Sequence, residues 1–107
     1  MASTPIPINL EVTNAATTLY TAYVGGTTTS AQLVSLDLQN KTTSEITVDV
    51  WILVGATLTL LADDMPIRPR GHAAWRGVVA LADGDILKAQ SSVANSVDAL
   101  GTVVETV

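Results

Sequence analysis

The stretch LVSLDLQNKTTSEITVDVWILV, residues 33–54, decides the fold class. In its first part apolar and polar residues alternate, so Val34, Leu36 and Leu38 share one face of an extended chain and polar residues occupy the other. Alternation with a period of two is typical of a half-buried β-strand. The polar segment NKTTS, residues 40–44, predicts a turn, after which the alternation resumes. The stretch therefore predicts two strands joined as an antiparallel hairpin.

The second of these strands, residues 45–54, has one face made only of aliphatic side chains, and Trp51 and Leu53 lie on the opposite face. If the aliphatic face packs in the core, Trp51 and Leu53 point away from it. A Trp and a Leu exposed together on a small domain form a patch that another chain can cover. The alternative is that another segment of the same chain covers both. The sequence alone leaves both interpretations open.

Strand signals recur along the rest of the chain. Thr and Val are frequent, and β-branched residues favour a pleated sheet over a helix. No segment has an apolar stripe of helical period that is long enough to indicate a helix. Further strands are expected at residues 16–24, 56–62, 73–81, 85–92 and 96–106. The sequence thus predicts an all-β fold, an antiparallel β-sandwich of jelly-roll type in a single domain.

The N-terminal segment is expected to differ from the rest. Pro5 and Pro7 fix φ and have no amide hydrogen to donate to a sheet, so residues 1–9 are expected to form an extended arm. We expect residues 1–15 to hold this arm and a first short strand, and residues 16–107 to form the sandwich domain. Because prolines lower the entropy lost on ordering, the arm is a candidate strap for contact with a partner. MASTPIPINL lacks the features of a secretory signal.

Length, charge and cysteine content exclude several classes of function. A chain of 107 residues is long enough for one domain with its own core. It has no cysteine, which excludes disulfides and thiolate chemistry. The net charge is −5 with only five Lys and Arg, so the basic stripe of a nucleic-acid-binding protein is missing. The apolar run at residues 51–62 is about half of the roughly 20 residues that a membrane-spanning helix needs. Neither nucleic acid nor a membrane is expected as a partner.

The segment LADGDILKAQSS, residues 81–92, raises the question of an acidic metal or proton-transfer site. A calcium loop of the EF-hand kind needs oxygen ligands at alternate positions and a glutamate at the twelfth. Counting from Asp83, the fifth position is Leu87 and the twelfth is Ala94, so the pattern fails. Asp and Gly favour turns through local hydrogen bonds and positive φ, and we interpret the segment around Asp85 as a turn.

Other motifs of catalysis or cofactor binding are missing. The pair Asp63–Asp64 is also interpreted as a turn, because it precedes the proline-containing segment MPIRPRGH, residues 65–72. His72 is the only histidine, and there is no G-x-S-x-G motif. The segment VGGTTTS has neither the lysine nor the spacing of a phosphate-binding loop. We therefore expect no enzyme activity, no cofactor and no metal.

The segment IRPRGHAAWR, residues 67–76, is a basic island on an acidic protein. Arginine and tryptophan are enriched among residues that dominate binding energy at interfaces. The segment is either a solvated loop or a contact with a partner. Together with the arm and the strand at 45–54, it completes the set of candidate contact residues: Pro5, Pro7, Trp51, Leu53, Arg68, Arg70, His72, Trp75 and Arg76.

The segment TLYTAYVGGTTTSAQLVSLDLQNKTTSEITVDVWIL, residues 18–53, resembles a pattern in small virion proteins of tailed bacteriophages. Their pattern has an LYT strand, a glycine-containing turn, a strand that ends in Asn, a Thr/Ser turn and a Val-rich strand. The short segment Pro66–Ile67, LADGDILK and SSVANSVDALGTVVE are also similar, so the resemblance extends over roughly residues 16–106. The basic island at 67–76 is richer in arginine than this pattern, and no long C-terminal fibre segment follows.

The resemblance implies a β-sandwich building block of a virion that is assembled in the bacterial cytoplasm. We expect a capsid decoration or cement protein, a homo-oligomer such as a trimer, that bridges coat subunits. The alternative within the same class is a neck, collar, tail or fibre accessory protein, whose partners would be other virion proteins. From a different class, a carbohydrate-binding module is a further alternative, and its only aromatic side chains would be Tyr20, Tyr23, Trp51 and Trp75.

Overall fold

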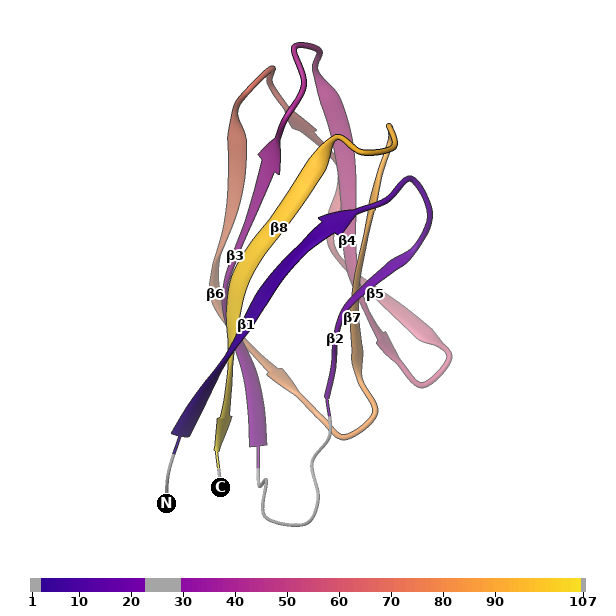
Figure 1. The fold of residues 1–107 in the computed structure, drawn as a ribbon. Helices are drawn as coiled ribbons and strands as arrows, with labels where there is room; N and C mark the ends of the chain where they lie inside the picture. The colour runs from indigo at the N-terminus through magenta and orange to yellow at the C-terminus, as the bar shows by residue number, and fades with distance from the viewer. Residues whose placement is uncertain (1–2, 23–29, 107) are drawn as a thin grey trace.

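The computed structural model describes residues 3–22 and 30–106, and these form eight β-strands in two four-stranded antiparallel sheets packed face to face (Figure 1). The first sheet has the order β1-β8-β3-β6, and the second has the order β2-β7-β4-β5. The bounds are β1 (Ser3–Val12), β2 (Thr17–Thr21), β3 (Ser30–Asn40), β4 (Ile46–Val54), β5 (Thr57–Ile67), β6 (His72–Leu81), β7 (Ile86–Ser91) and β8 (Val97–Thr106). The predicted all-β sandwich is confirmed. The described part of the chain has no helix that is long and apolar enough to cross a membrane.

The core lies between the two sheets and consists of aliphatic side chains from nearly every strand. Leu33, Leu36 and Leu38 of β3 are almost completely buried, and so are Val48 and Val50 of β4. Leu36 and Leu38, and likewise Val48 and Val50, are separated by one partly exposed residue, as a period of two requires. Burial of such apolar area stabilises the fold by roughly 25 cal/mol per Å2 removed from water.

The predicted hairpin of residues 33–54 is wrong in one respect: its two strands lie in different sheets. β3 pairs with β6 and β8, whereas β4 pairs with β5 and β7. The turn between them is a corner, which the side chain of Asn40 holds by donating to the carbonyl oxygens of Ser44 and Ile67. Both strands carry one wholly apolar face. Placing these faces opposite each other across the core buries both of them, whereas a hairpin within one sheet would require a further layer.

A bulge in β3 changes which residues of this strand face the core. The register of β3 with both neighbours shifts between Leu33 and Ser35, so Leu33 and Leu36 are buried while Val34 is only partly buried. Gly101 of β8 lies against this bulge, because a Cβ atom placed there would stand 2.4 Å from the carbonyl oxygen of Ser35. The expected inward position of Val34 therefore fails at a β-bulge, which inserts one residue into the alternation.

The expected extended arm at residues 1–9 is also corrected. Residues 3–12 are extended, but they form β1, which pairs with β8 from Ser3↔Thr106 to Val12↔Val97. Ile8 and Val12 are buried in the core. Pro5 and Pro7 are accommodated because β1 is an outer strand of its sheet, where a missing amide hydrogen breaks no ladder. The N-terminal segment is thus part of the sandwich.

The ADGD segment is the turn that the sequence predicts, and it connects β6 to β7. Gly84 has a φ of 88°. The side chain of Asp85 is buried, and its Oδ2 accepts a hydrogen bond from the amide of Ala82 at 2.9 Å. The backbone carbonyl of Asp85 accepts from the amide of Ala22, and the amide of Gly84 donates to the carbonyl of Ala22. Asp85 therefore has a structural role at the end of the sandwich.

Candidate functional site

The predicted contact residues do not converge on one surface. Pro5 and Pro7 are exposed on β1, Trp51 and Leu53 lie on β4, and the basic island lies at the β5–β6 connection.

Trp51 is buried by its own chain. It is 8% exposed and lies on the outer face of the second sheet, where Leu60 of β5 and Lys88 of β7 are its partners in register. Directly paired residues share a face and lie within contact distance of each other. Leu53 is partly buried between Leu58 and Ile86 in the same way. Of the two interpretations of Trp51, coverage within the fold is correct.

The end of the β4–β5 hairpin projects from the sandwich, as the hairpin on the right of Figure 1 shows. We call residues 53–60 the projecting hairpin. Gly55, with a φ of 64°, forms its tip. Val54 is 48% exposed, and Leu58 and Leu60 are each 51% exposed. Thr57 and Thr59 on the other face are exposed as well, so this part of β5 contacts the rest of the chain only through β4 and exposes much of both faces.

An apolar cleft of about 250 Å3 opens where the outer strands β5 and β6 face each other across the sandwich. We call it the edge cleft. Its lining residues are Leu36, Leu38, Val50, Leu61, Ala62, Met65, Ala74 and Trp75. Trp75 pairs in register with Leu36, so it faces into the sandwich, although the sequence analysis grouped it with the basic island. Its Nε1 is buried and has no hydrogen-bond partner among the described residues. A buried N–H without an acceptor is costly, so the cleft contains one unsatisfied donor.

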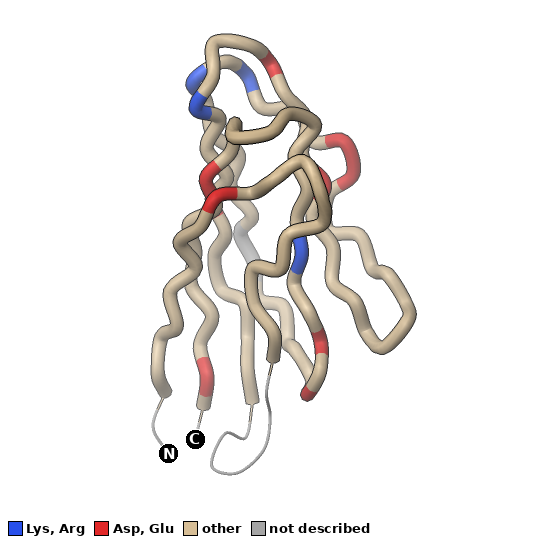
Figure 2. Tube along the Cα trace, turned by 45° about the vertical axis from the view of Figure 1, so that its right-hand side comes forward, with Lys and Arg blue, Asp and Glu red and all other residues tan. Residues whose placement is uncertain are grey.

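The basic island forms a loop at the upper end of the molecule in Figure 2. Arg68, Arg70 and His72 are exposed, and Arg70 has a φ of 58°. Asn40 donates to the carbonyl of Arg68 at 3.1 Å, and the amide of Arg70 donates to the carbonyl of Thr42 at 2.9 Å. The side chain of Arg76, the third arginine of the island, lies outside the described residues. The described arginines are thus held at the surface by backbone contacts.

The cationic side chains in and beside this loop differ in whether they form salt bridges with carboxylates. Lys41 forms salt bridges with Glu11 at 2.7 Å and with Asp98 at 3.1 Å. These two hydrogen bonds raise the pKa of Lys41. No salt bridge joins Arg68 or Arg70 to a carboxylate among the described residues. Their charges therefore remain available, and Arg70 lies at a polar depression of about 430 Å3, which Gln39–Lys41 and Arg70–His72 line.

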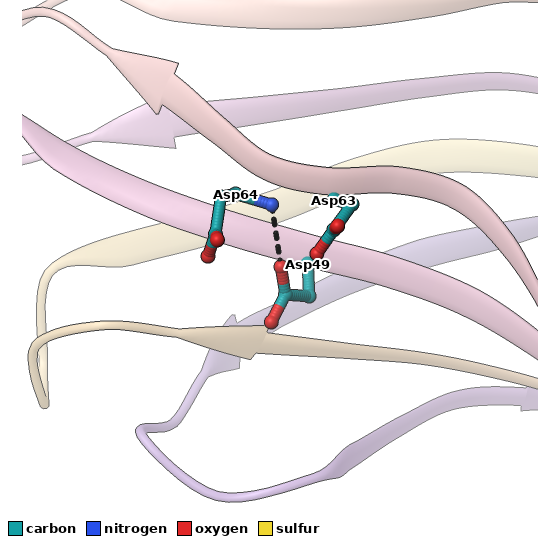
Figure 3. A group of neighbouring side chains, drawn as sticks. All are labelled: Asp49, Asp63 and Asp64. Carbon is teal, nitrogen blue, oxygen red and sulfur yellow. Dashed lines mark hydrogen bonds between the residues drawn. The ribbon is translucent and has the colours of Figure 1, made fainter.

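Asp49, Asp63 and Asp64 form an acidic cluster in which one carboxylate oxygen of each lies within 4.8 Å of the others (Figure 3). The interpretation of Asp63–Asp64 as a turn is wrong, since both residues lie in a bulge within β5. Asp64 has a φ of 47°, and its amide donates to Oδ1 of Asp49 at 2.6 Å. Carboxylates at such spacing are ligands for hard cations such as Ca2+. Sequence reasoning missed the cluster because Asp49 comes from the neighbouring strand.

The arrangement of the remaining polar side chains is structural. Tyr20 donates a short hydrogen bond to the carboxylate of Glu105, which joins β2 of one sheet to β8 of the other. Burial raises the pKa of Tyr20, and the hydrogen bond and the charge of Glu105 raise it further. His72 is exposed, and in the described part of the chain no hydrogen bond joins it to a carboxylate or a hydroxyl.

The aromatic side chains that the structure describes form no exposed platform for a sugar. Trp51 is buried, Trp75 faces the interior and Tyr20 is bound to Glu105, whereas Tyr23 lies outside the described residues. Stacking on a sugar would require an exposed aromatic face. The described residues therefore give no support to a carbohydrate-binding module.

Comparison with known proteins finds similarity of fold and not of sequence. No protein-family model matches the chain, and no curated protein sequence does. A pentameric capsid protein isolated from metagenomic phage sequences aligns with 92% of this chain at 23% identity and a TM-score of 0.53, and the chain spans 60% of that protein's length. A chain of the acidic stable capsid structure of the Helicobacter pylori bacteriophage KHP30 aligns with 100% of this chain and 89% of its own length, at 13% identity and a TM-score of 0.57. At these identities the likeness establishes a shared fold.

Proposed function

We propose that this protein is a structural component of a bacteriophage particle, and specifically a capsid decoration or cement protein. The observation that carries the proposal is the match to the chain from the KHP30 capsid structure, which extends over all of this chain and 89% of the other. The second match is also to a phage capsid protein. Chains that share one fold from end to end share the geometry in which their surfaces can be presented to neighbours in a shell.

The strand order also supports the jelly-roll type that we assign to the sandwich. Eight strands divide between sheets of order β1-β8-β3-β6 and β2-β7-β4-β5, and most connections cross from one sheet to the other. Double sheets of eight strands with such connections are the framework of many viral capsid domains. The described residues offer no catalytic constellation that would compete with a structural role.

The proposed mechanism is adhesion, in which each copy bridges neighbouring coat subunits. Many identical weak contacts add up when the copies are held in one array. Two described surfaces suit this role. The exposed Arg68 and Arg70 form a basic end on a protein with a net charge of −5, which suits an acidic surface of a coat protein. The projecting hairpin offers an apolar contact of a different kind.

The test is the protein composition of purified phage particles, measured by quantitative mass spectrometry. A decoration protein should be present at a copy number comparable to that of the major coat protein. A copy number far below that of the coat protein would favour a neck, collar or tail accessory protein, and absence from the particles would refute both forms of the proposal.

The contribution of the basic end is tested by the double variant Arg68→Ala/Arg70→Ala. We expect it to fold as stably as the wild type, because both side chains are exposed and unpaired with carboxylates among the described residues. It should bind undecorated particles more weakly in co-sedimentation, and the binding should lose part of its dependence on salt. Unchanged binding at every salt concentration would remove the basic end from the contact.

A further inference from the structure

The projecting hairpin is an unusual feature, because it leaves an apolar edge strand unprotected. Residues 51–62 contain no charged side chain and no proline. Proteins normally blunt an outer strand with charges, prolines or bulges, since its free backbone groups can pair with other chains. On β5 these devices begin only at the bulge of Leu61 and continue with the bulge of Asp63–Asp64 and with Pro66, so residues 57–60 have none of them. The outer half of β5 thus has the properties of a contact surface.

The edge cleft has the complementary shape and chemistry. Its eight lining residues are apolar, and its volume of about 250 Å3 is well above the 150 Å3 of an apolar cavity that holds benzene. It can therefore receive about one or two leucine side chains.

The hairpin cannot fill the edge cleft of its own chain. Leu58 and Leu60 pair in register with Leu53 and Trp51, so they lie on the outer face of the second sheet. The edge cleft opens between the two sheets, on the inner face. An apolar projection and an uncharged cleft therefore occur on opposite faces of one chain, and only another molecule can bring them together.

We propose that the projecting hairpin of one copy packs into the edge cleft of a second copy of this chain. The choice of an identical partner rests on the proposed function, since a decoration protein is held as many copies on one shell. Because the hairpin and the cleft are different surfaces, the contact is head-to-tail, and contacts of this type generate closed rings or open rows. Leu58 and Leu60 are its central side chains.

The experiment measures the mass of the purified protein by light scattering after size exclusion, over a range of concentrations. The wild type should form oligomers, and Leu58→Glu/Leu60→Glu should weaken self-association by about 100-fold or more, as expected when central apolar contacts are lost. The matched control is Val93→Glu, an equally exposed apolar residue outside both surfaces, which should leave association unchanged. Circular dichroism confirms that each variant is folded.

A second variant tests the cleft from the other side. Ala62 lines the edge cleft and pairs in register with the core residue Val50, so Ala62→Arg blocks the cleft and leaves Leu58 and Leu60 intact. Each variant alone should be monomeric, but a mixture of Ala62→Arg and Leu58→Glu/Leu60→Glu should form a dimer, because one supplies the hairpin and the other the cleft. Oligomers that survive both changes, or a wild type that is monomeric at all concentrations, would overturn the inference. Either result leaves the proposed function to be decided by the composition of the particles.

Discussion

Replacing Asn40 with alanine should lower the free energy of unfolding by about 3 kcal/mol, because this side chain holds the corner between the sheets. Asn40 is 3% exposed. Its Nδ2 donates to the carbonyl of Ser44 at 2.8 Å and to those of Ile67 and Arg68 at 3.1 Å each. Because Nδ2 has only two hydrogens, these contacts amount to two bonds. Its Oδ1 accepts a third bond from the amide of Thr42 at 2.9 Å. The hydroxyl of Thr42 also lies 2.7 Å from Oδ1, but its single hydrogen can go to the carbonyl of Ser44 instead, so this contact is left out of the count. A net contribution of about 1 kcal/mol for each bond gives the total.

The assay is equilibrium unfolding in urea, with the slope of the free energy against urea checked for two-state behaviour. The matched control is Gln39→Ala, an exposed neighbour whose replacement should change the unfolding free energy by less than about 0.5 kcal/mol. Asn40→Asp keeps the acceptor but places a carboxylate against three carbonyl oxygens, so it should be at least as destabilising as Asn40→Ala. If Asn40→Ala matched the control within error, the side chain would not hold the corner and the reasoning would fail.

Three further predictions concern other contacts of the sandwich. Gly101→Ala should lower the unfolding free energy by about 1–3 kcal/mol in the same assay, because the added Cβ would lie 2.4 Å from the carbonyl oxygen of Ser35; an unchanged value would contradict the close packing. The pKa of Tyr20 is raised above its ordinary value of 10.0, so the protonated form is favoured by folding and the stability it gives should be lost as the pH rises above 10.0. Thermal melts should show a steeper loss for the wild type than for Tyr20→Phe, and parallel curves would contradict the role of Glu105. Asp63→Asn should stabilise the fold by at most about 1 kcal/mol for each neighbouring carboxylate, less at high salt, since like charges lie within 4.8 Å; a destabilised variant would indicate a bound cation or a lost contact.

The fold class could be predicted because period-two alternation depends only on one face of each strand being buried. The pairing of strands could not, because alternation says which face is buried and not which strand lies beside it. Residues 33–54 illustrate this limit. A hairpin and a corner both need a polar turn, and the difference lies in contacts of Asn40 with Ile67 and Arg68, which are distant in the sequence.

The N-terminal strand could have been predicted from the sequence. Ile6, Ile8, Leu10 and Val12 alternate with other residues, which is the pattern that identified the later strands. The two prolines led to the expectation of an arm instead of a strand, but proline is excluded only from a central strand of a sheet. The acidic cluster could not have been predicted from the sequence, because its formation depends on the register of β4 against β5 and on the bulge at Asp63–Asp64.

Trp51 and Leu53 show how a correct pattern can still leave function open. Their outward orientation was predicted correctly, but neighbours on β5 and β7 cover Trp51, and the exposed apolar surface lies further along β5 at Leu58 and Leu60. Leu58 and Leu60 are exposed because the hairpin extends beyond the sandwich. Nothing in the sequence marks where a strand leaves the body of the fold.

The most direct test is a cryo-electron microscopy reconstruction of the phage particle that contains this chain. The account predicts eight-stranded sandwiches on the outer surface of the shell in a repeating array, with the projecting hairpin of each copy seated in the edge cleft of the next. Density for the sandwich at the neck or tail alone would contradict the decoration role. A decorated shell in which the hairpin points into solvent would contradict the contact between copies.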